Sequence, residues 1–173
     1  RPPTPRGRIT TVWSRVRTST AGDPLRGRRV LVTGHTGFKG AWLSAWLHKL
    51  GAEVHGYGLA PPARGAFHDL GVAGFTQSVG GDVRDAAGVD AAVAAVQPEL
   101  VFHLAAQPLV RRAWAERRAT FDTNVMGTVN VVEAALSTDT VAGVVVVTTD
   151  KVYAHDAAGA AFVGTDRLGG HAP

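Results

Sequence analysis

The chain of 173 residues is long enough for one domain with a buried core, and its 45% hydrophobic content and mean hydropathy of +0.04 are typical of globular proteins. It contains no cysteine, which excludes disulfides and thiolate-bound metals, and its seven histidines lack metal-ligand spacing, so we expect no metal site. No apolar run approaches the roughly 20 residues of a membrane-spanning helix, so we expect no membrane partner.

The basic character of the chain, with a pI near 10.1, belongs to its N-terminus. Residues 1–29 contain eight arginines and one acid, Asp23, whereas the rest has ten basic and thirteen acidic side chains. An arginine-rich arm can bind nucleic acid or a membrane surface, or act as a transit peptide. Its prolines and glycines favour a disordered extension over residues 1–25, followed by a mildly acidic domain over 26–173 without a nucleic-acid partner.

Strand-like apolar runs alternate with helical patterns from residue 29 onward, which predicts an α/β fold with a doubly wound parallel sheet. The expected strands are 29–33, 53–57, 77–80, 100–104 and 144–147, and the expected helices are 37–50, 86–96 and 112–136. In the first helix, the i, i+4 pattern predicts that Phe38, Trp42, Trp46 and Leu50 face the core. The same pattern predicts an inner face of Val125, Val129, Val132 and Leu136 in the last helix, and the valine run 144–147 predicts a fully buried strand.

A glycine-rich loop joins the first expected strand to the first expected helix. Its glycines recur at steps of three, where a tight turn, close approach of backbone to a pyrophosphate and close packing of helix on strand each favour glycine. The helix N-terminus that follows supplies N–H donors and a partial positive charge. This pattern predicts dinucleotide contacts from Gly34, Thr36, Gly37, Phe38, Lys39 and Gly40.

Ligands of parallel sheets lie beyond the carboxyl ends of the strands, so the residues at those ends are further candidates. After the third strand, Asp82 can accept a hydrogen bond from an adenine amino group with Val83 flanking the ring, or it can only form a turn. After the fourth strand, Leu104, Ala105 and Ala106 leave room for a dinucleotide. After the fifth, Asp150 and Lys151 stand at the mouth of an apolar strand, where they need solvent, each other or a ligand.

The acidic residue that usually binds the adenosine ribose at the end of the second strand is missing. Glu53 lies at the start of that strand, at the wrong edge of the sheet. Arg64 is weak support for a 2′-phosphate, so the residues alone leave NAD and NADP open.

Five segments resemble CDP-glucose 4,6-dehydratases of the extended short-chain dehydrogenase/reductase superfamily: residues 34–43, 103–111, 123–128, 148–153 and 168–171. Lys151 occupies the position at which the related dTDP-glucose and GDP-mannose dehydratases usually have Glu. The resemblance, which spans residues 26–173, implies a Rossmann-type fold, NAD as cofactor, CDP-glucose as substrate, a cytoplasmic location and a homo-oligomer in the complete form.

The resemblance also implies roles for individual residues. Thr149 would hydrogen-bond the C4 oxygen of the sugar, Asp150 would be the acid at C6, and Lys151 would act at C5. Substrate contacts would come from Gln107, Arg112 and Asn124.

The chain departs from the family at several positions. It has Ala113-Trp114 in place of a Ser-Tyr pair and Arg117 in place of a proline, and it ends at Pro173, before the family's Tyr-x-x-x-Lys pair. We therefore expect a Rossmann domain truncated after the fifth strand, which binds NAD without turnover. The alternatives are another extended short-chain epimerase or reductase of sugar nucleotides, or a non-catalytic nucleotide-binding fragment.

Overall fold

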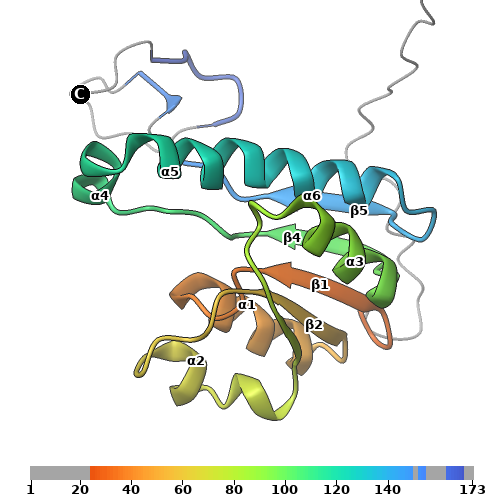
Figure 1. The fold of residues 1–173 in the computed structure, drawn as a ribbon. Coiled ribbons are helices and arrows are strands. Elements are labelled where there is room, and N and C mark those ends of the chain that lie inside the picture. The colour runs from red at the N-terminus through yellow and green to blue at the C-terminus, as the bar shows by residue number, and fades with distance from the viewer. Residues whose placement is uncertain (1–23, 150–151, 155–162, 170–173) are drawn as a thin grey trace, which may run out of the picture.

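The computed structural model describes residues 24–149, 152–154 and 163–169. In this part of the chain, five parallel strands form one sheet in the order β3-β2-β1-β4-β5 (Figure 1). The strands are β1 (Arg29–Thr33), β2 (Glu53–Gly58), β3 (Gln77–Gly80), β4 (Leu100–His103) and β5 (Gly143–Val146). The order reverses between β1 and β4, which confirms the doubly wound parallel sheet expected from the sequence.

Helices cover both faces of the sheet (Figure 1). On one face lie α1 (Phe38–Lys49), α2 (Ala66–Asp69) and the 3₁₀ turn η2 (Val72–Gly74), and on the other lie α3 (Ala86–Val96) and α6 (Gly127–Leu136). The helix expected over 112–136 is interrupted, as α4 (Val110–Ala115), α5 (Arg117–Phe121) and the π-helical segment η3 (Asp122–Met126) precede α6. It breaks at Glu116, whose φ of −122° and ψ of 55° lie outside the helical region.

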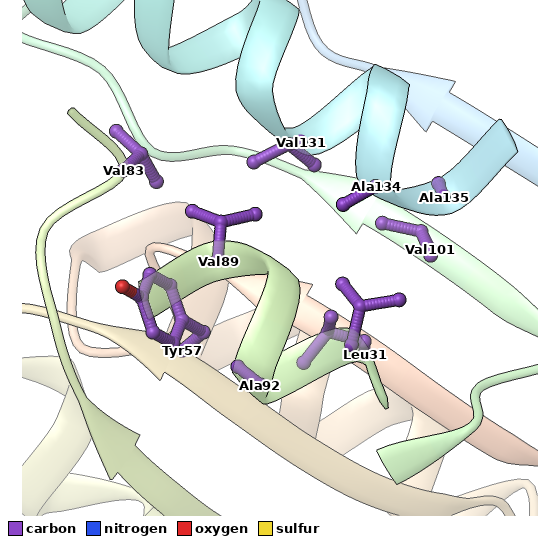
Figure 2. Packing of buried hydrophobic residues seen from close by; sticks show 10 residues of the cluster. Leu31, Tyr57, Val83, Val89, Ala92, Val101, Val131, Ala134 and Ala135 are labelled. Atoms are coloured by element: carbon purple, nitrogen blue, oxygen red, sulfur yellow. The ribbon is translucent and has the colours of Figure 1, made fainter. Parts of the chain in front are cut away.

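The core on the α3 and α6 side joins both helices to the sheet. Figure 2 shows Leu31 and Val101 of the sheet facing Val89 of α3 and Val131 of α6. These four side chains are at most 2% exposed, so burial of branched apolar side chains stabilises the junction of β1 with β4.

Helix α1 packs on the sheet through small side chains, and the expectation that its aromatic stripe faces the core is wrong. Its buried residues are Gly40, Ala41, Ser44 and Leu47, whereas Phe38, Trp42 and Trp46 are 74%, 53% and 63% exposed. A Cβ on Gly40 would collide with the backbone of Gly34 and His35. The helix therefore lies too close to the end of β1 for large side chains to fit between them.

Helix α6 repeats this arrangement. Its buried residues are Gly127, Val131, Ala134 and Ala135. Of the stripe expected to face inward, Val125, Val129 and Leu136 are exposed and Val132 is half-buried. A Cβ on Gly127 would lie 2.6 Å from the Val83 side chain, so close packing again selects the small residues.

Strand β5 is less buried than its valine run predicts. Val145 and Val147 are 40% and 43% exposed. Val144 packs toward the α6 side, so its neighbour Val145 points to the opposite face. On that face the described helix α1 packs over β1 and β2 (Figure 1).

The two faces of α1 predict opposite responses to substitution. Leu47→Ala should lower the free energy of unfolding by about 2–5 kcal/mol because it opens a cavity in the core. Trp46→Gln should change it by no more than about 0.5 kcal/mol because the ring is largely in solvent. Urea denaturation followed by circular dichroism measures both, and equal losses would contradict this packing of α1.

The contact between α1 and the end of β1 predicts a second difference. Gly40→Ala should destabilise the chain by about 1–3 kcal/mol, since the new Cβ forces the Gly34 backbone to move. Gly74→Ala is the matched control, because a Cβ there meets nothing within 4 Å. A Gly40→Ala chain as stable as the control in the same urea titration would show that the helix can shift at no cost.

Candidate functional site

The carboxyl ends of the strands open into a groove of about 610 Å³. Its lining includes every residue predicted to contact a dinucleotide: Gly34, Thr36, Gly37, Phe38, Lys39, Gly40, Asp82, Val83, Leu104, Ala105 and Ala106. Gln107 and Arg112 also line it, whereas Asn124 lies behind it. Thr149 follows the lining residue Thr148, and the predictions for Asp150 and Lys151 fall outside the described residues.

The glycine loop forms the floor of the groove. Gly34 has a φ of +71°, and a Cβ there would lie 2.8 Å from the backbone of Ala105. The turn is closed by a 3.0 Å hydrogen bond from the Gly37 N–H to the Gly34 carbonyl oxygen, and α1 begins at the next residue. No side chain of the described residues caps this N-terminus, so its first N–H groups and the helix dipole, together with Lys39, are suited to a phosphate.

A buried histidine holds the glycine loop against β2 and β3. The Nε2 atom of His35 lies 2.9 Å from the Ser78 Oγ, and its ring packs so closely on Gly56 that a Cβ there would collide with it. Burial lowers the pKa of His35, which favours the neutral ring. The role of His35 was not predicted from the sequence, although a glycine inside a strand, here Gly56, can signal close approach of another group.

Asp82 is held in place by Arg84. The Arg84 guanidinium donates to both carboxylate oxygens, at 2.6 Å in the closest case, and the Arg84 N–H donates to Oδ1 at 3.0 Å. These hydrogen bonds lower the pKa of Asp82, which therefore stays ionised. A carboxylate has further lone pairs, so Asp82 can still accept from a ligand at the groove. Beside it, Val83 is 4% exposed, and its side chain packs mainly in the core.

The wall of the groove after β4 is tied to η3. The side chain of Asn124 accepts a hydrogen bond from the Gln107 N–H at 2.7 Å and donates to the Gln107 carbonyl oxygen at 3.1 Å. The Gln107 side chain bonds Leu109 and Thr120. Arg112, which also lines the groove, forms an exposed ion pair with Glu116 at 2.9 Å. In this structure Gln107 and Asn124 therefore shape the wall.

The β2 end of the groove carries no acid among its described lining residues. Gly58 and Leu59 occupy it, whereas Glu53 pairs with His55 at 3.1 Å and lies beside Arg29, at the far end of β1. Arg64 is not among the residues that line the groove. Among the described residues, the acid nearest in sequence to this end of β2, Glu53, therefore lies at the opposite end of the strand.

The described residues offer neither a metal site nor a membrane-spanning helix. No group of three histidine, cysteine or acidic side chains in this part of the chain could hold a metal ion. None of its helices combines the length and apolarity needed to cross a membrane.

The chain is similar to known proteins over most of its length. A CDP-glucose 4,6-dehydratase of Salmonella typhimurium is 46% identical over 129 residues, which cover 74% of this chain and 36% of that protein. The crystal structure of the Bordetella bronchiseptica enzyme WbmH in complex with NAD+ matches with a TM-score of 0.56 and 28% identity, over 66% of this chain and 37% of WbmH. The chain thus spans little more than a third of the length of these relatives.

A further structure shows the same fold at lower identity. The UDP-glucose-4-epimerase of Stenotrophomonas maltophila, solved with bound NAD and formylated UDP-arabinopyranose, matches with a TM-score of 0.70 and 23% identity, over 82% of this chain and 42% of the epimerase. The sequence profile of the NAD dependent epimerase/dehydratase family matches residues 30–169, which contain the lining of the groove and all of the sheet except Arg29, the first residue of β1. The chain therefore belongs to the NAD dependent epimerase/dehydratase family, whose cofactor is the NAD expected from the sequence.

Proposed function

We propose that this chain is the dinucleotide-binding part of an NAD-dependent sugar-nucleotide 4,6-dehydratase, which converts CDP-glucose to CDP-4-keto-6-deoxyglucose. The observation that carries the proposal is the groove, which brings the glycine loop, Asp82 and the wall after β4 to one edge of the sheet. The 46% identity to the Salmonella typhimurium dehydratase supports the choice of reaction.

The residues of the groove fit NAD. The groove surface at Gly37, beside the uncapped N-terminus of α1, would take the pyrophosphate. Asp82 would accept from the adenine amino group, and the small residues Ala105 and Ala106 would leave room beside the wall. NAD held by these residues would supply the redox chemistry, as the acceptor and later the donor of a hydride at the sugar.

The elimination of water falls to residues after β5. With a ketone at C4 the C5 proton becomes acidic, and its loss together with the C6 hydroxyl gives an alkene. We assign Asp150 as the acid that protonates the leaving hydroxyl, Lys151 as the group acting at C5, and Thr149 as the donor to the C4 oxygen. Support comes from the resemblance and from Val147 and Thr148, which line the groove just before them.

The sugar nucleotide would contact Gln107 and Arg112, which line the same groove, and Asn124 would act on it through Gln107. We place this activity in the cytoplasm, as the resemblance implies. The complete protein is proposed to be a homo-oligomer, as the resemblance implies.

NAD binding should be lost in Gly37→Val, because the valine side chain occupies the space through which a phosphate reaches the N–H groups of α1. Isothermal titration calorimetry of the 173-residue chain with NAD measures the affinity. Gly74→Val is the matched control, since that position is open and distant from the groove. Unchanged affinity in Gly37→Val would overturn the assignment of the groove.

The 173-residue chain alone should not convert CDP-glucose, because it lacks the base of the Tyr-x-x-x-Lys pair, worth roughly 10²–10⁴-fold. A chimaera that continues it with the C-terminal part of the Salmonella typhimurium enzyme should form the 4-keto-6-deoxy product without net consumption of NAD.

In that chimaera, Asp150→Asn should slow water loss more than sugar oxidation, because Asp150 is assigned to protonation of the leaving hydroxyl.

Single-turnover absorbance of the reduced nicotinamide distinguishes these steps. Accumulation of the absorbance in the Asp150→Asn chimaera, but not in the parent chimaera, is the expected result. A folded, NAD-loaded parent chimaera that shows no absorbance change with CDP-glucose and epimerises another sugar nucleotide would instead support the epimerase alternative.

A further inference from the structure

A series of hydrogen bonds runs beneath the groove and connects four elements, β1, β4, α6 and η3. The Thr33 Oγ1 at the end of β1 lies 2.7 Å from the Nδ1 of His103 in β4. The His103 Nε2 lies 3.0 Å from the Thr128 Oγ1 in α6, and the Thr128 hydroxyl donates to the Asn124 carbonyl oxygen at 2.7 Å. Thr33 and His103 are 1% and 2% exposed, so these partners are shielded from water.

The direction of each hydrogen bond follows from counting protons. The single hydroxyl proton of Thr128 is used on the Asn124 carbonyl, so Thr128 must accept from an Nε2–H of His103. In the neutral ring Nδ1 is then an acceptor, and it receives the hydroxyl proton of Thr33. The two lone pairs of the Thr33 hydroxyl oxygen remain for the N–H groups of Leu104 and Ala105, at 3.2 and 3.3 Å, and the Leu104 N–H also donates to the Thr33 carbonyl oxygen at 3.2 Å.

The neutral ring is favoured where it lies. Burial lowers the pKa of His103 from its ordinary value of 6.5, because a buried imidazolium loses its hydration. A proton on Nδ1 would face the Thr33 oxygen, which would then have to give up one of the two loop N–H groups. The arrangement is therefore specific to one tautomer of one charge state.

Both ends of this series of hydrogen bonds hold the same segment of the groove. Thr33 holds Leu104 and Ala105, while Asn124 holds Gln107 through both its N–H and its carbonyl oxygen. The segment 104–107 lines the groove, and its Ala105 packs against Gly34 of the glycine loop. A change in which ring nitrogen of His103 carries the proton would therefore affect the wall both through Thr33 and through Asn124.

We propose that His103, as the neutral Nε2–H tautomer, is a positioning residue that acts through Thr33 and Thr128 to hold the 104–107 wall in the conformation that binds the dinucleotide. The inference rests on the proposed function for the identity of the ligand, NAD. Its structural part, the tautomer, can be measured without any ligand.

The tautomer is tested by nitrogen NMR of the ¹⁵N-labelled chain. The Nε2 of His103 should carry a proton and its Nδ1 should have the shift of an unprotonated ring nitrogen. Thr128→Val, which removes the acceptor of the Nε2–H, should shift the ring toward the other tautomer, and Thr128→Ser should retain the wild-type spectrum. A proton on Nδ1 in the wild-type chain would overturn the proposal whatever the chain binds.

Calorimetry with NAD tests the effect on the wall. Thr33→Val should weaken NAD binding by about tenfold, the order expected when the part-buried Ala105 N–H loses its acceptor, and Thr33→Ser should restore the wild-type affinity. Thr128→Val should also weaken binding, whereas its matched control Thr138→Val should leave it within about twofold. Thr138 makes the same bond to the carbonyl four residues back, at Ala134, but lies outside this series of hydrogen bonds.

The outcomes separate the two proposals. If the wild-type chain does not bind NAD, the proposed function fails, while the nitrogen spectra still decide the tautomer. If Thr33→Val does not fold, the comparison of Thr128→Val with Thr138→Val decides the positioning role. Equal affinities for NAD in these two variants would overturn that role, and a lower affinity in Thr128→Val alone supports it.

Discussion

The structure depends on a close approach of backbone to backbone at the end of β1. Gly34 turns the chain with a positive φ, lies against Ala105 on one side and packs against Gly40 of α1 on the other, with no room for a Cβ at either glycine. This contact sets where α1 begins and directs its uncapped N-terminus into the groove. It also brings the wall after β4 against the glycine loop. One packing constraint thereby creates both the shape of the groove and its capacity for an anion.

The same constraint explains which helix faces are buried. The buried residues of helices α1 and α6 are mostly small, and the larger apolar side chains buried in them are Leu47 and Val131. Short helix–sheet distances exclude large rings, so Trp42 and Trp46 lie on the outer face of α1 although they are apolar. An apolar stripe at helical spacing is therefore not by itself evidence of the buried face when a parallel stripe of small residues exists on the same helix.

Hydrogen bonds of buried polar side chains fix the position of the segments that form the edge of the groove. His35 and His103 lie under the glycine loop and under the wall, and burial lowers the pKa of both. A buried imidazole that lost its partner would destabilise the fold, so each ring restricts the segments that it bonds: β3 through Ser78, and α6 through Thr128. Arg84 does the same for Asp82 at the surface of the groove.

The sequence alone determined the α/β class, the strands and their order of appearance, and the residues at the strand ends that line the groove, because apolar periodicity and glycine spacing are local properties of the chain. It did not determine which stripe of α1 or α6 faces inward, the break of the long helix at Glu116, or the partners of His35, His103 and Asn124. Those features depend on distances between segments far apart in the sequence, such as Gly34 and Ala105 or Thr33 and Thr128. Only the packed tertiary structure fixes these distances, since a contact across the sheet leaves no period in the sequence.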